Sequence, residues 1–448
     1  MGKTDIALTR FGLGARPGER VAVAKDPESW LKDQTKPRSA DMPASKGVLF
    51  SAEGFRKIRM ARQDLRRAAD GGDAKKAGDF LKTLRPYYAA DVKARVEHAV
   101  TTTASFRERM VLFWSNHFTV SAAGKPHLIG VIGTLEREAI RPNVMGKFED
   151  MLLAVARHPV MLAYLDNIQS VGPNSRGGRF KDVGLNENYA RETLELHTLG
   201  VNGGYAQDDV IALAKILTGW SVDRTSGAFT FRKAAHEPGA KTLLGERYSK
   251  AGVSQGESAL KGLARHPSTA RHIAEKLARH MRADAPPDTL VERLERTFIK
   301  TNGDLGALSR TLIDSPEMWE ADQAKFKTPN EFIVSALRAL NAGGPDSPVP
   351  DRLALSFDLM AQRPFFAPSP AGWPDGAADW AGPSAVKQRL EWSQQIAAMA
   401  GGKANPAQLG EAVLGDLLGE TTRFHVAGAE SGAQGLTLML MAPEFQRR

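Results

Sequence analysis

Apolar residues recur at spacings of three and four along most of this chain, which is the pattern of helices with one buried face. The pattern is clearest in the segments 105–118, 132–140, 148–165, 208–220, 268–281, 290–301, 305–319 and 330–340. Alternation with a period of two is nearly absent, and strands are expected only in 227–233 and 241–248, which would form a small hairpin. No internal repeat of fixed period occurs. The sequence therefore predicts a mainly α fold, a large non-repeating helical globular body with a small β-hairpin insertion.

Length and loop composition indicate three regions within one compact unit. With 448 residues, 42% of them hydrophobic and 25% charged, the chain can bury a large core. We expect an N-terminal helical region at 1–222 that carries the candidate site, a loop or β-hairpin insertion at 223–256, and a C-terminal helical region at 257–448.

Charge and cysteine content narrow the function classes. The formal net charge is +9, from 60 Lys and Arg residues against 51 Asp and Glu residues. The basic residues are spread along the chain, whereas a nucleic-acid-binding protein usually gathers them into one stripe with aromatic side chains, so no nucleic acid partner is expected. The chain has no cysteines, which excludes disulfides, thiolate metal sites and a cysteine nucleophile. No run of about 18 apolar residues occurs, so no transmembrane segment is predicted.

The most polar helical pattern lies at 186–200 and runs into a glycine turn. On a regular helix Asn188, Glu192 and Glu195 fall at i, i+4 and i+7, so they share one face. Two carboxylates one turn apart raise each other's pKa unless a cation or an arginine neutralises them. Arg191 lies within reach of carboxylates four residues away on either side. Structural ion pairs, general acid and base catalysis, and metal ligation therefore all fit this helix.

Four further places offer polar or aromatic side chains beside apolar helices. His117 ends an aromatic helical run and fits either a satisfied core histidine or a general acid, base or ligand. Asp166 and Asn167 fit either a cap and turn or the binding of hydroxyl groups. Trp220 fits either a core position or a ring that stacks on a sugar. His236, in the loop that follows, fits either a solvated turn or a residue that closes over a cleft.

Several longer motifs resemble one bacterial family. They are "TRFGLGARPG", "ERMVLFWSNHFTVS", "LDNIQSVGPNS", "GLNENYARETLELHTLGVNGGYAQDDV", "LTGW", "HEPGAKTLLG" and "RPFFAPSPAGWPDG". From about Thr9 to the final "APEFQRR", the chain is similar to the family called domain of unknown function 1800. The resemblance implies a mostly helical fold, export from the cytoplasm, and a sulfatase-like partner protein that carries a twin-arginine leader. It implies no catalytic role.

The resemblance also sets an expectation for location and for one ligand position. We expect a periplasmic or secreted protein, although "MGKTDIALTRFGLGARPGE" lacks the apolar core of a signal peptide, which fits the cytoplasm as well. Many family members have a second histidine before the Asn-His pair, and this chain has Ser115 there. If that position binds a metal in the family, this chain lacks one ligand.

Our first functional hypothesis is an exported helical hydrolase that cleaves a polysaccharide or oligosaccharide by carboxylate acid and base catalysis. Glu192 or Glu195 would be the general acid, and Asp166 or Asp209 the base or nucleophile. Such a pair must lie about 5 to 5.5 Å apart for retention or about 6.5 to 9.5 Å apart for inversion. The predicted substrate-binding residues are Asn167, Asn188, Arg191, Trp220 and His236, while His117 and His197 complete the catalytic candidates.

Two other hypotheses stay open. The second is a metal-dependent enzyme that holds a divalent cation with His117, His197, Glu192 and Glu195, with His236 as an additional candidate. The zinc-protease pattern His-Glu-x-x-His is absent, and the spacing of Glu195 and His197 does not fit a di-iron Glu-x-x-His motif. The third is a non-catalytic protein that binds the sulfatase-like partner or an anionic polymer, which the net charge of +9 favours.

Overall fold

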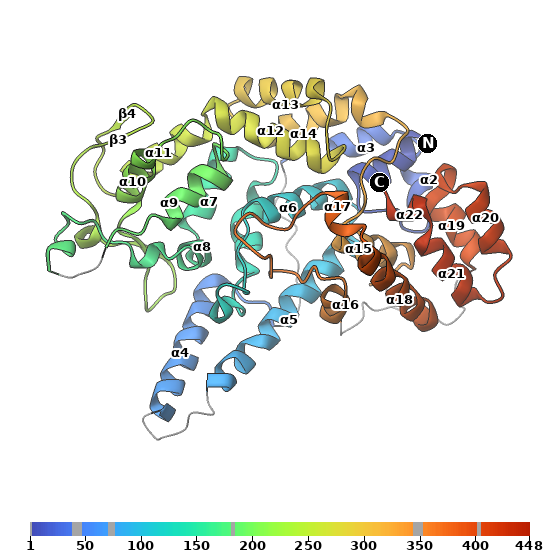
Figure 1. The fold of residues 1–448 in the computed structure, drawn as a ribbon, viewed down its shortest axis with the longest axis horizontal. Coiled ribbons are helices and arrows are strands. Elements are labelled where there is room, and N and C mark those ends of the chain that lie inside the picture. Colours follow the sequence, from blue (N-terminus) through green and yellow to red (C-terminus); the bar gives the residue numbers. More distant parts are fainter. Residues whose placement is uncertain (1, 38–46, 70–76, 181–183, 344–352, 401–404) are drawn as a thin grey trace.

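The computed structural model describes residues 2–37, 47–69, 77–180, 184–343, 353–400 and 405–448 (Figure 1). Besides short 3₁₀ turns, the elements before residue 220 are α1 (Lys3–Ile6), the π turn η1 (Ala7–Phe11), α2 (Glu19–Val23), α3 (Pro27–Asp33), α4 (Ser51–Ala69), α5 (Ala77–Thr101), α6 (Ser105–His117), the π turn η4 (Glu136–Ile140), α7 (Phe148–Arg157), α8 (Pro159–Tyr164), α9 (Asn188–Glu192), the π turn η8 (Thr193–His197) and α10 (Gln207–Leu217). The elements that follow are β1 (Trp220–Val222), β2 (Phe229–Phe231), β3 (Lys241–Leu243), β4 (Glu246–Tyr248), α11 (Val253–Ala264), α12 (Pro267–Met281), α13 (Asp288–Lys300), α14 (Leu305–Asp314), α15 (Pro329–Ala339), α16 (Leu353–Leu359), α17 (Ala377–Trp380), α18 (Pro383–Ala400), α19 (Pro406–Leu414), α20 (Glu420–Ala427), α21 (Gly432–Met441) and α22 (Pro443–Gln446). The predicted mainly α fold is confirmed.

The helices form an elongated body with one projecting arm (Figure 1). Helices α7 to α11 and the strands occupy one end, and α18 to α22 occupy the other. Helices α12, α13 and α14 pack in succession along one long edge, α6 lies near the middle, and the α4–α5 pair projects away from the opposite edge. No helix in the described residues is both long and apolar enough to cross a membrane. The division into regions 1–222, 223–256 and 257–448 stays a prediction.

The two segments that were expected to pair with each other form separate hairpins. β2 pairs antiparallel with β1, which places Trp220 opposite Phe231, and β3 pairs with β4. Leu244 and Gly245, at the tip between β3 and β4, have φ of 51° and 78°. Two consecutive residues with positive φ make the tight turn that suits a two-residue hairpin loop. The segment 241–248 therefore pairs within itself, and β2 takes the strand before it as its partner.

Aromatic packing in the core fixes the end of α6. The rings of Trp114 and Phe118 lie 5.7 and 6.2 Å from the ring of Phe148 at the start of α7, measured between centroids, and all three side chains are buried. Aromatic pairs at these separations are favourable beyond the area that they bury. This cluster holds His117, the last residue of α6, in the interior.

Buried arginines tie the N-terminal segment to the second half of the chain. The Arg10 guanidinium is fully buried and donates to the carbonyl of Met318 at 2.7 Å. Arg338 is also fully buried, donates to the carbonyl of Gly14 at 2.8 Å and pairs with Glu19 at 2.9 Å. A guanidinium can be buried when carbonyl and carboxylate oxygens satisfy its N–H groups. The N-terminal segment is thus part of the main body.

Candidate functional site

The helix expected at 186–200 is present but changes its pitch. Helix α9 continues directly into the π turn η8, so Glu192 lies in α geometry and Glu195 in π geometry. A π turn inserts a residue into the regular register. The shared face expected from a period of 3.6 therefore holds for Asn188 and Glu192 and does not extend to Glu195.

The arginine of this helix bonds to neither of the carboxylates that were predicted to act. Arg191 donates to Gln207 at 2.9 Å and lies 3.4 Å from Glu187. Burial, and then the charge of Glu195, raise the pKa of the half-buried Glu192 carboxyl. Asn188 is exposed.

The two acids predicted as base or nucleophile are already bonded. Asp166 accepts two hydrogen bonds of 2.7 Å from the ammonium of Lys125. Asp209 accepts from the backbone N–H of Leu244 at 2.7 Å and from that of Ala206 at 2.9 Å, so it caps α10 and holds the hairpin. Asp209 has a structural role in this arrangement.

Three predicted substrate-binding residues are wholly or half buried. Asn167 is buried and donates to the carbonyls of Leu217 and Trp220 at 3.2 and 2.9 Å. The Trp220 side chain is fully buried and packs edge-on against Phe229. His236 is half-buried, and its Nδ1 lies 2.9 Å from the carbonyl of Thr218. The structure places Trp220 in the core, where its ring is covered by protein.

His117 and His197 come together from distant segments. The Nε2 atom of His117 lies 3.2 Å from the carbonyl of His197, and the ring centroids are 6.4 Å apart. The ring of His272, from α12, lies 6.1 Å from that of His117. Burial, and then the charge of Lys276, lower the pKa of His197 to about 3 and that of His117 well below its usual value. Both imidazoles are therefore neutral at pH 7.

The described residues do not assemble the predicted metal ligands. No group of three or more histidine, aspartate or glutamate side chains among them is arranged to hold a metal ion. Lys276 and His272 are the titratable groups that shift the pKa of His197, and neither Glu192 nor Glu195 is among them. Within the described residues, neither Glu192 nor Glu195 forms a hydrogen bond or an ion pair with His117 or His197.

A cavity of about 270 Å³ opens beside His117. The end of α6, one face of α12, the start of α15 and the segment 362–375 enclose it, and we call it the α6–α12 cavity. Its lining consists of Arg95, Arg109, Leu112, Phe113, Ser115, Asn116, His117, Thr119, Val120, Lys276, Arg279, His280, Thr328, Asn330, Glu331, Gln362, Pro364, Phe365, Ala367, Ala371, Trp373, Pro374 and Asp375. His117 is the predicted site residue in this lining.

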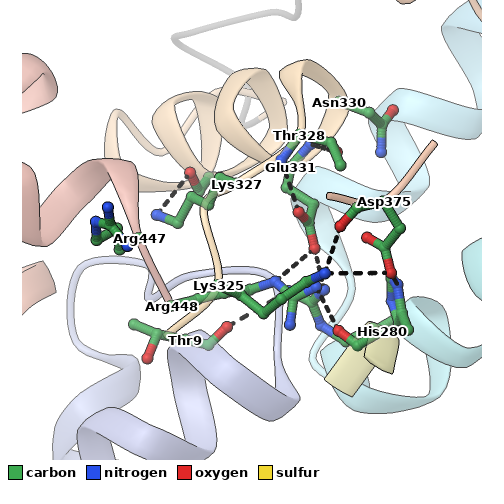
Figure 2. Close-up of polar contacts among 12 residues, drawn as sticks. Thr9, His280, Lys325, Lys327, Thr328, Asn330, Glu331, Asp375, Arg447 and Arg448 are labelled. Carbon is green, nitrogen blue, oxygen red and sulfur yellow. Dashed lines mark hydrogen bonds and ion pairs between the residues drawn. The ribbon is translucent and has the colours of Figure 1, made fainter. Parts of the chain in front are cut away.

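Glu331 is the buried anion of the cavity wall (Figure 2). Its carboxylate pairs with Arg109, and Nε of Arg448 lies 2.7 Å away. It also accepts the backbone N–H of Thr328 at 2.8 Å, which closes a capping box at the start of α15. Burial alone would raise the pKa of Glu331, but Arg448 and Arg109 hold it well below its usual value. Glu331 is therefore ionised and already occupied by two cations.

A second charged group lies next to it and joins α12 to the segment 362–375 (Figure 2). Nδ1 of His280 lies 3.1 Å from a carboxylate oxygen of Asp375. The ammonium of Lys325 lies 3.5 Å from the same carboxylate and 2.6 Å from Asp284. Burial, only partly offset by Asp375, lowers the pKa of His280. The imidazole is neutral at pH 7, and its Nε2 has no hydrogen-bond partner in the described part of the chain.

Asn116 holds the loop that closes the other side of the cavity. Its side-chain amide donates to the carbonyl of Trp373 at 2.9 Å and accepts from the Trp373 N–H at 2.8 Å. Gly372, at φ +89°, lets this loop approach, because a Cβ there would lie 2.5 Å from the carbonyl of Asn116. The indole of Trp373 thereby becomes part of the wall.

Comparison with known proteins assigns nearly the whole chain to one family. The family model described as "Protein of unknown function (DUF1800)" matches residues 6–447. The chain belongs to the DUF1800 family. No curated protein and no solved structure matches it.

Two cations distinguish this DUF1800 cavity from an ordinary buried salt-bridge cluster. Lys276 and Arg279 lie three residues apart on α12, and both line the cavity. Within the described residues, neither side chain has a hydrogen bond or an ion pair. Burial, opposed by Asp375 and assisted by Arg279, lowers the pKa of Lys276 to about 8.

The sequence did not single out most of these DUF1800 cavity residues. Lys276, Arg279 and His280 occur in an ordinary amphipathic helix pattern, and Glu331 looks like a first-turn acid of the helix predicted at 330–340. One signal was available: the spacing of three and four from Lys276 to Arg279 and His280 places all three on one face of α12. The cavity forms because this face of α12 lies opposite residues that are distant in the sequence, such as His117, about 160 positions earlier, and Asp375, about 100 positions later.

Proposed function

We propose that this protein binds a small anionic ligand, or the anionic end of a larger one, in the α6–α12 cavity. The observation that carries this proposal is that Lys276 and Arg279 stand in the wall without an ion-pair partner in the described residues. The other two cations of the lining are engaged, Arg95 with Glu136 at 2.7 Å and Arg109 with Glu331. Lys276 is half-buried and Arg279 is exposed. A half-buried cation without a hydrogen bond or an ion pair favours an anion as its ligand.

The size and the lining of the cavity support a ligand with one flat apolar face. A volume of about 270 Å³ is close to the lower end of small-molecule sites, roughly 300 to 1,000 Å³. Trp373, Phe113 and Phe365 contribute aromatic surface, which stacks well on planar groups or sugar rings. The formal net charge of +9 adds a long-range attraction for anions that salt screens.

Substitution of Lys276 by methionine should weaken anion binding by at least about tenfold, because a charge-assisted hydrogen bond contributes roughly 1.5 to 3 kcal/mol. Isothermal titration with uronates and with sulfated and phosphorylated sugars measures this. Since the pKa of Lys276 is lowered to about 8, its ammonium is present below that pH and lost above it. Affinity should therefore fall as the pH rises through about 8, and it should fall with added salt.

The matched control is Lys261→Met, on the exposed surface of α11, which should leave affinity unchanged. Equal affinity of the Lys276→Met variant and the unaltered chain for an anion that binds would contradict the proposal, as would the absence of binding by every anion in the set.

One observation also supports the hydrolysis of a glycan, which we propose as a second candidate. The pKa of Glu192 is raised by burial and by Glu195, and its carboxyl has no hydrogen bond or ion pair in the described residues. A carboxyl with a raised pKa can hold the proton that a general acid delivers. Export and pairing with a sulfatase-like protein stay predictions.

Glu192→Gln should lower the release of new reducing ends from a responsive polysaccharide by roughly 100-fold or more, because it removes the acidic proton while keeping the shape of the side chain. Glu187→Gln is the matched control, since Glu187 is the N-cap residue of the same helix and pairs with Arg191. Full activity in the Glu192→Gln variant would rule out this candidate.

A further inference from the structure

In the described residues, the α6–α12 cavity holds a primary amine without a hydrogen bond or an ion pair, and we propose that Lys276 forms an imine there with the carbonyl group of a small oxo acid. This inference rests on the proposed anion binding and deepens it by naming the substrate class. Of the lining side chains, Lys276 carries the only amine. Amine nucleophiles of this kind are activated by desolvation and by a neighbouring cation.

The surroundings of Lys276 supply both of these conditions. Arg279, one turn further along α12, is the neighbouring cation, and together with burial it disfavours the charged amine. Asp375 and the neutral imidazoles of His117, His197 and His272 interact electrostatically with the amine, and His280 and Glu331 line the same cavity. With a pKa of about 8, roughly a quarter of the amine is neutral at pH 7.5, against about 0.1% for an unperturbed lysine.

Arg279 indicates that the substrate carries a carboxylate next to its carbonyl group. It lines the same cavity, and within the described residues it has no hydrogen bond or ion pair. A guanidinium binds a carboxylate with two parallel hydrogen bonds and thereby orients it. A substrate that places its carboxylate on Arg279 presents an adjacent carbonyl group towards the turn of α12 that carries Lys276.

His280 is placed to move the protons of this step. It lies four residues after Lys276, on the same face of α12, and lines the same cavity. Its Nδ1 lies 3.1 Å from Asp375, and its Nε2 has no partner in the described residues. A carboxylate behind an imidazole stabilises the protonated ring.

The step balances without an oxidant or a reductant. The lone pair of the Lys276 amine attacks the carbonyl carbon, and the electrons of the C–O π bond move to the oxygen. His280 accepts a proton from the nitrogen and returns it to the oxygen, which gives a neutral carbinolamine. His280 then takes up one proton from solvent and delivers it to the hydroxyl, which leaves as water while the nitrogen lone pair forms the C=N bond, so one proton is consumed, one water is released and a protonated imine joins Lys276 to the substrate.

The test uses glyoxylate as the probe and sodium borohydride to reduce any imine at pH 7.5. Peptide mapping of the full chain by mass spectrometry should find one carboxymethyl group on Lys276, at least about tenfold above the mean of the surface lysines. Lys276→Arg should lose this adduct while it keeps the positive charge, and Lys261→Arg should not. Arg279→Met should label Lys276 less with glyoxylate and equally well with formaldehyde, which has no carboxylate.

The outcomes distinguish failure of the imine on Lys276 from failure of the anion site. Anion binding in the titrations without an adduct on Lys276 would overturn the imine and leave the anion site standing. An adduct spread evenly over the surface lysines would overturn it too, and the map of the unaltered chain decides this even if the Lys276→Arg variant does not fold. Absence of both binding and adduct would overturn the inference and the proposed function together.

Discussion

Replacing Glu331 with glutamine should lower the free energy of unfolding by roughly 3 to 5 kcal/mol, because two buried guanidinium groups lose their counter-ion. The carboxylate pairs with Arg109 and lies 2.7 Å from Arg448, and all three side chains are buried. A glutamine of the same shape keeps the packing and removes the charge. Urea denaturation at pH 7, followed by circular dichroism, measures the change.

The matched control is Glu292→Gln on α13. Glu292 lies 3.5 Å from Arg296, with the side chains 55% and 70% exposed, respectively. An exposed pair of this kind contributes at most about 1 kcal/mol. If the two variants lose equal stability, then the Glu331 carboxylate does not stabilise the buried guanidinium groups of Arg109 and Arg448.

Arg141→Met should cost a similar amount, roughly 3 to 5 kcal/mol at pH 7, because it leaves two buried carboxylates without their shared cation. Arg141 binds Glu108 through two hydrogen bonds of 2.7 and 2.6 Å and Glu136 at 2.7 Å, and all three residues are buried. The methionine fills much of the same space without the charge. Arg296→Met, at an exposed position on α13, is the control, and equal losses would contradict the assignment.

The cost of Arg141→Met should depend on pH in a defined direction. Burial alone would raise the pKa of both acids, but Arg141 holds that of Glu108 below its usual value, and Arg95 with Arg141 does the same for Glu136. A depressed pKa contributes stability that is present above the unfolded value, about 4.5, and lost as the pH falls through the folded value. Without Arg141 the two pKa values rise, so the acids take up protons at higher pH. The difference between the variant and the unaltered chain should therefore shrink from pH 7 to about pH 4.

The fold class could be predicted because its signal is local. The spacing of apolar residues predicted the segments that became α6, α7, α10 and α12 to α15, since each helix shows its own buried face in the sequence. Strand pairing is a relation between segments, and there the prediction was wrong: β2 pairs with β1 instead of with the segment 241–248. The π turn at Thr193–His197 also leaves no periodic signal, because five residues are too few to show a period.

The site could be predicted only in part, for the same physical reason. His117 was identified because it ends an aromatic helical run, and it does lie at the cavity. Lys276 and Glu331 look like ordinary helix-surface charges, and their burial comes from partners such as Arg109 and Asp375, far away in the sequence. Trp220 was predicted as a candidate sugar-binding residue, because a tryptophan beside polar residues fits such a face as well as a core. In the structure it packs against Phe229 and Gly256 and is buried.

The buried arginines that fasten the N-terminal segment also govern the order in which this chain can fold. The partner of Arg10 lies 308 residues later, and the partner of Arg338 lies 324 residues earlier. During synthesis, residues 3–20 leave the ribosome long before the carbonyls and guanidinium that will satisfy them. Contacts of such sequence separation form slowly, and surfaces that await them are prone to aggregation. We therefore expect the contacts of the N-terminal segment to be among the last to form during folding.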